Sequence, residues 1–229
     1  MTLRHALLVG VRAAKANFLP GVLLQGIMAC VLSLYLFHDG SRAFFRLVGE
    51  SRQELGVVFA MVSYTFSGAL LPEIMRALLF QRGRVDAGNL QRFVTLAPLW
   101  IIMATAVDHF YTAQNEWFGF GNGFSTVATK VLVDQLLYSP LFATPVIAGY
   151  FAIRAGGFQK AAIASVFRLK FLTETLLPVQ LASWMIWFPG VTFVYIMPPP
   201  LQIPFAVLVH TFWVLILTTI SERNKIPRA

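Results

Sequence analysis

The chain has 229 residues, of which 57% are hydrophobic and only 12% are charged. An ordinary soluble domain carries about 25% charged residues, so the composition argues against a soluble fold. The net charge of +8 would suit a nucleic-acid binder, but the basic residues lie in short clusters between apolar runs and form no continuous basic face. We therefore expect a single membrane domain over residues 1–229, with the lipid bilayer as its partner and no nucleic acid.

The amino-terminal residues carry basic groups without any acid. Arg4, Arg12 and Lys15 are interspersed with leucines and valines on one helical stripe. This pattern predicts an interfacial amphipathic segment over residues 1–17, and an organellar targeting segment is the alternative. The apolar run that follows lacks a clear small-residue cleavage site, so we expect it to remain as the first span.

Apolar runs fill most of the remaining chain. A helix of about 20 mostly apolar residues crosses the hydrocarbon core, because it satisfies its own backbone groups. The sequence therefore predicts an all-α fold, a polytopic transmembrane helix bundle with five or six spans plus amphipathic surface helices. The expected spans are Phe18 to Phe37, Leu55 to Met75, Phe93 to Phe110, Val127 to Ile153, Leu176 to Met197 and Leu201 to Ile220.

The segments between these spans differ in charge. Lys160, Arg168 and Lys170 interrupt apolar residues over 157–172, which predicts an amphipathic helix on the membrane surface. With six spans, most basic residues fall on the side that also holds both termini. Basic loops stay on the cytoplasmic or matrix side, so we predict both termini there. The loops expected on the opposite side cover residues 38–54, 111–125 and 198–200.

Ionisable residues inside the spans are costly, so each requires a partner or a function. Asp134 follows Lys130 by one helical turn and precedes Gln135 directly. Two interpretations remain open here. The first is an ion pair that neutralises both charges on one helix face, and the second is a set of polar side chains that line a pore.

The other ionisable residues favour structural roles. Glu73 lies three residues before Arg76, which predicts a local ion pair rather than a role in transport. Asp108 and His109 are expected to be solvated at the opposite interface. His210 lies in an apolar helix, where a hydrogen-bonded interior histidine is more common than a metal ligand.

Motifs for catalysis are missing from the sequence. We find no nucleophile with a nearby base, no paired carboxylates, no phosphate-binding loop and no spacing typical of metal ligands. The single cysteine, Cys30, allows no intrachain disulfide and no cysteine-based metal cluster. We therefore expect neither an enzyme nor a cofactor or metal.

Two motifs in the second half of the chain resemble the Mpv17/PMP22 family of small integral membrane proteins. The stretch KVLVDQLLYSP has the spacing K-x-x-x-D-Q-x-x-x-x-P, and LPVQLASWMIWFP is similar to the family signature W-P-x-x-Q-x-x-N-F. Leu177 stands where the signature has its first tryptophan. The residues that match are Lys130, Asp134, Gln135, Pro140, Pro178, Gln180, Ser183, Trp184, Pro198 and Trp213.

The resemblance implies a channel-like role in the permeability of a bacterial inner membrane or of an organellar membrane, mitochondrial inner or peroxisomal. The expected function is thus a channel for ions or small solutes, with Lys130, Asp134, Gln135, Gln180, Glu73 and His210 as pore or polar-network residues. The alternative is a non-catalytic structural subunit of a larger membrane protein complex. Small residues such as Gly68 and Gly149 would then allow close contact between helices, in a homo-oligomer or with other subunits.

Overall fold

The computed structural model describes residues 18–225, and every regular element in that range is a helix. Five helical runs are long and apolar enough to cross a membrane, and a shorter apolar stretch covers Pro199–Leu215. The predicted fold class, an all-α polytopic helix bundle, is confirmed. The predicted interfacial segment over residues 1–17 lies outside the described residues. The five runs are Phe18–Phe37, Val57–Phe80, Ala87–Phe118, Phe124–Ala155 and Leu169–Ile196.

The chain divides into two compact units. Of the described residues, unit 1 contains 18–25 together with Gly123–Thr192, and unit 2 contains Gly26–Asn122 together with 193–225. Two of the three boundaries fall inside helices, α2 (Phe18–Phe37) and α11 (Leu177–Ile196), and the third falls in the loop at Asn122 and Gly123. The expectation of a single membrane domain remains a prediction.

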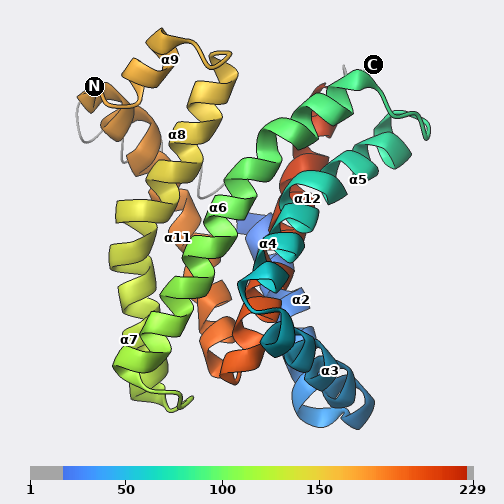
Figure 1. Cartoon of the computed structure of the whole chain (residues 1–229), viewed down its shortest axis with the longest axis vertical. Helices are drawn as coiled ribbons and strands as arrows, with labels where there is room; N and C mark the ends of the chain where they lie inside the picture. The colour runs from blue at the N-terminus through green and yellow to red at the C-terminus, as the bar shows by residue number, and fades with distance from the viewer. Residues whose placement is uncertain (1–17, 226–229) are drawn as a thin grey trace. The chain divides into compact units, whose positions relative to one another are not determined.

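Unit 2 is built around one long helix. Helix α6 (Ala87–Phe118) packs along α4 (Val57–Thr65), and α12 (Pro199–Lys225) packs against α3 (Asp39–Leu55), α4 and α5 (Leu71–Phe80) (Figure 1). Small side chains permit this close approach, because Ala60 and Ala104 are fully buried. Larger buried side chains fill the remaining space. They include Leu99, Met103, Phe205 and Val209.

Two elements of unit 2 differ from the sequence-based expectation. Most of residues 38–54, expected as a loop, belong to helix α3. Its first turn is capped by the His38 ring, which accepts a hydrogen bond from the Ser41 N–H. Helix α6 is longer than the expected span. It begins at a capping box of Asp86 with Asn89 and ends before Gly119, whose φ of 92° breaks the helix. A polar cap and a glycine fix these two ends, whereas hydropathy indicates only the apolar middle.

Prolines in the spans coincide with π-helical segments. The three segments η1 (Phe66–Leu70), η2 (Asp134–Ala143) and η3 (Leu172–Leu176) each end two residues before a proline, namely Pro72, Pro145 and Pro178. In each case the residue just before the proline donates its N–H to the carbonyl five residues earlier. The wider turn relieves the clash between the proline ring and the preceding turn, so the spans continue past their prolines.

Unit 1 contains α7 (Phe124–Val133), η2 and α8 (Thr144–Ala155), which form one continuous span. The region predicted as one surface helix over 157–172 holds two short helices, α9 (Lys160–Ser165) and α10 (Leu169–Phe171). Helix α10 continues through η3 into α11, so the fifth span begins earlier than expected. Near the start of this fifth span, the charges of Lys170 and Glu174 offset each other in an ion pair of 3.8 Å.

Candidate functional site

The polar residues predicted at the centre of the fourth span are all buried. Lys130 has no exposed surface, and Asp134 and Gln135 are almost completely buried. Gln180 of α11 and Ser139 of η2 are buried in the same unit. We call these five residues the polar cluster of unit 1. Two apolar spans that together bury a lysine, an aspartate and two glutamines are unusual, because each such group is costly to place in a membrane.

Hydrogen bonds connect members of the cluster. The Gln135 side-chain amide donates to the Asp134 carboxylate at 2.9 Å. The Gln180 amide nitrogen donates to the Ser139 hydroxyl at 3.0 Å and joins α11 to η2. Gln180 matches the glutamine of the Mpv17/PMP22 signature, and the residue it contacts is Ser139. The side-chain oxygen of Gln135 is buried and has no hydrogen-bond partner among the described residues.

The geometry of η2 explains the position of Trp184. In a π-helix the carbonyl of Gln135 would accept a hydrogen bond from the N–H of residue 140, but this residue is a proline and has no N–H. The Trp184 indole Nε1–H donates to the Gln135 carbonyl instead, at 2.7 Å. A side chain of α11 thus satisfies a carbonyl that Pro140 leaves free, as backbone groups within a membrane require.

We expect Trp184→Phe to lower the free energy of unfolding by about 1 kcal/mol, because it keeps an aromatic ring but removes the donor to the Gln135 carbonyl. Adding Pro140→Ala restores an N–H at the position that a π-helix pairs with this carbonyl. The cost of Trp184→Phe should therefore be smaller in the Pro140→Ala background. A double-mutant cycle on the purified protein in detergent measures this coupling.

Trp100→Phe is the control for this cycle. The Trp100 Nε1 has no hydrogen-bond partner among the described residues, so this substitution removes no hydrogen bond. Its cost should be the same with proline or alanine at position 140. An equal cost of Trp184→Phe in both backgrounds would show that the indole does not replace the missing N–H.

The other two predicted polar residues belong to unit 2. Glu73 forms the expected ion pair with Arg76, and its second oxygen accepts hydrogen bonds from Arg92 Nε at 2.8 Å and from Asn89 at 2.9 Å. His210 is an interior histidine, as expected, with its Nδ1 hydrogen-bonded to the Ser67 hydroxyl at 2.9 Å. Glu73 therefore anchors the start of α6, and His210 joins α12 to η1.

The expectation for Asp108 was wrong. Its carboxylate is buried and forms an ion pair with Arg52 of α3, whereas His109 is exposed as predicted. Asp108 is buried because α3 is a helix that carries Arg52 to this end of α6. Sequence analysis could not find this pair, since the two residues lie 56 positions apart.

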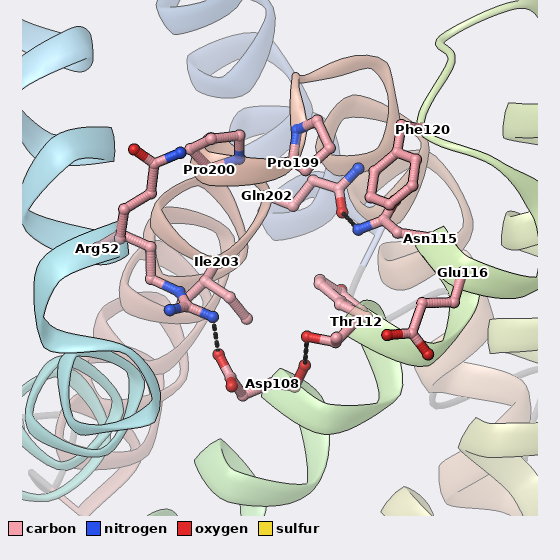
Figure 2. A pocket seen from close by; sticks show the side chains of 12 residues that line it. Arg52, Asp108, Thr112, Asn115, Glu116, Phe120, Pro199, Pro200, Gln202 and Ile203 are labelled. Carbon is pink, nitrogen blue, oxygen red and sulfur yellow. Dashed lines mark hydrogen bonds and ion pairs between the residues drawn. The ribbon is translucent and has the colours of Figure 1, made fainter.

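A pocket of about 230 Å³ in unit 2 is lined by this ion pair (Figure 2). Asn115 donates a hydrogen bond to the Gln202 side-chain oxygen at 3.0 Å along one wall, and Glu116 lies across the pocket from Arg52. A water molecule occupies about 30 Å³ in the liquid, so the pocket has room for several waters or one small polar solute. It is smaller than a typical pocket for a drug-sized ligand.

The remaining motif residues occupy structural positions. Pro178 is buried and follows η3, Ser183 and Trp213 are half-buried, and Pro198 lies exposed between α11 and α12. Ser139, Asn115 and Gln202 are polar residues that the sequence analysis did not select. Ser139 lies four residues after Gln135, so helical spacing could have indicated it. The other two come from separate helices and left no such signal.

Among residues 18–225, no group of three or more histidine, cysteine, aspartate or glutamate side chains is placed to hold a metal ion. Cys30 is exposed. The expectation that the protein is not an enzyme remains a prediction.

Comparisons with known proteins give one distant relative. The chain is similar to "PXMP2/4 family protein 2" of Dictyostelium discoideum, with 24% identity over 133 residues. The match covers 57% of this chain and 65% of that protein. No protein-family model matches the chain, and no solved structure matches it either. Together with its apolar helices, this similarity indicates an integral membrane protein that is at most a distant relation of the PXMP2/4 family, itself related to Mpv17/PMP22.

Proposed function

We propose that the protein forms a permeability pathway for ions or small solutes across a bacterial inner membrane or an organellar membrane. The observation that carries the proposal is the polar cluster of unit 1, which buries Lys130 and Asp134 in a span of otherwise apolar character. Buried charges in a span usually face a water-filled path or a neighbouring polar group, and charged side chains near a path determine which ions pass. The resemblance to the Mpv17/PMP22 family supports the same class of function.

The pocket of unit 2 also supports a permeability pathway. It offers an arginine, two carboxylates and three amides to a small solute. Polar groups of this kind replace part of the hydration shell of a permeating molecule where a pathway is narrow.

The decisive test is single-channel recording in planar bilayers with the purified full-length protein. We expect discrete conductance steps for the wild type and a lower preference for cations in Asp134→Asn, because this variant removes a negative charge from the path. Asp39→Asn is the matched control, since the Asp39 side chain is 98% exposed at the start of α3. Its conductance should equal that of the wild type.

A silent bilayer that contains inserted protein would contradict the proposal and favour the alternative, a structural subunit. Gly68 does not support this alternative, because it packs against Trp100 within the chain and is not free to contact a partner. Gly149 of α8 has no described atom within 4 Å of an added Cβ, but it is buried and offers no free surface either. Co-purification of stoichiometric partners would then identify the complex.

A further inference from the structure

The turn between α5 and α6 concentrates positive charge. The stretch from Glu73 to Arg92 contains four arginines and two acids, which leaves a formal charge of +2. Both acids are already engaged by this part of the structure: Glu73 binds Arg76 and Arg92, and Asp86 caps α6. The arginines of the turn itself form no ion pair with either acid, and the stretch keeps its net positive charge. These arginines are Arg82 and Arg84.

Arg82 and Arg84 are exposed, and neither side chain has a hydrogen bond or ion pair with any described residue. Arg82 also has a φ of 55°, in the left-handed region that favours glycine. The turn holds it there through the hydrogen bond from Gly83 N–H to the Ala77 carbonyl at 2.7 Å. An arginine at a position better suited to glycine suggests that its side chain has a function.

Arg92 is the third arginine of this region, after Arg82 and Arg84, with an N–H group that has no hydrogen-bond partner among the described residues. Its Nε binds Glu73, but its Nη2 is buried and has no hydrogen-bond partner among the described residues. The Arg92 side chain as a whole is 31% exposed. Glu73 thus holds this guanidinium in place and leaves donor capacity free.

Large apolar side chains surround the same turn. Between 63% and 76% of the surface of each is exposed. The turn connects two spans, Val57–Phe80 and Ala87–Phe118, so it lies at a membrane surface. Apolar side chains at this depth contact acyl chains, while arginines beside them reach the headgroups. The apolar residues are Leu78, Leu79, Val85 and Leu90.

We propose that this turn binds the phosphate of an anionic phospholipid headgroup, with Arg82 and Arg84 as the principal contacts and Arg92 as a further donor. A guanidinium group matches phosphate because its N–H groups form paired hydrogen bonds with two oxygens. The uncompensated positive charge selects an anionic lipid over a zwitterionic one. The leucines and the valine fit the acyl chains, which a free phosphate ion lacks.

The test measures retention of phosphatidylglycerol and phosphatidylcholine by the purified full-length protein, using native mass spectrometry. We expect Arg82→Gln/Arg84→Gln to lower the preference for phosphatidylglycerol by about 30-fold, since each basic residue near an anionic surface contributes about fivefold. The matched control is Arg42→Gln/Arg46→Gln on α3, which also removes two exposed arginines. It should retain the wild-type preference.

Arg82→Gly separates lipid binding from folding. Glycine adopts the left-handed conformation without strain, so this variant should unfold at a higher temperature in lipid-free detergent and still bind less phosphatidylglycerol. Equal losses in the two double variants would overturn the proposal, because the effect would then be one of total charge. Displacement of phosphatidylglycerol by an equal concentration of inorganic phosphate would also overturn it, since the site would then bind free phosphate.

Discussion

Asp108→Asn is expected to lower the free energy of unfolding by about 3–5 kcal/mol, because it leaves the charge of Arg52 without a counter-charge. The side chains of Arg52 and Asp108 are only 16% and 9% exposed, so water from the adjoining pocket replaces the lost partner only in part. Asparagine has nearly the same shape as aspartate, so the change in packing is small. Thermal unfolding of the purified protein in detergent measures the loss.

Two variants isolate the buried charge as the cause. Asp39→Asn makes the same substitution in an exposed ion pair, with Asp39 98% exposed and 3.5 Å from Arg42, and surface pairs contribute about 0–1 kcal/mol. Its effect should be close to zero. Arg52→Gln combined with Asp108→Asn removes both charges and should recover most of the lost stability. If the double variant were less stable than Asp108→Asn alone, the ion pair would not be the source of the effect.

The spans could be predicted from the sequence because hydropathy is a local property. Every expected span overlaps a helix of the structure, and the first, Phe18–Phe37, has the expected bounds. Helix ends were predicted less well, since they depend on caps and breaks such as Asp86 and Gly119. Helix α3 was missed because its charged residues resemble a loop in a search for apolar runs, although Arg46 and Glu50 are spaced one helical turn apart.

Contacts between helices explain what the sequence could not show about the candidate site. Lys130, Asp134 and Gln135 lie on one helix, so their proximity follows from helical spacing. The role of Trp184 depends on η2, where the π-helical register makes Pro140 the residue that should donate to Gln135. Hydropathy and motif spacing do not predict this register. Asp108 was expected at a solvated interface because its partner, Arg52, lies on another helix 56 residues away in the sequence.

Gly68→Ala is expected to destabilise unit 2 by about 1–3 kcal/mol, although alanine is intrinsically better in a helix. A Cβ at position 68 would lie 2.6 Å from the Trp100 ring, at Cε2 and Nε1, which is closer than packed atoms approach. Trp100 cannot easily move, because it is buried and its ring centroid lies 4.3 Å from that of His210. Thermal unfolding in detergent measures the loss.

Gly26→Ala in α2 is the same substitution, but it should change the stability in the opposite direction. No described atom lies within 4 Å of an added Cβ there, so only the gain in helix propensity remains and the protein should be slightly more stable. Combining Gly68→Ala with Trp100→Phe should cost less than the sum of the two single changes, because the smaller ring makes room for the methyl group. Strict additivity would mean that the methyl group and the indole do not compete for space. The contact between η1 and α6 would then be looser than the buried Trp100 ring indicates.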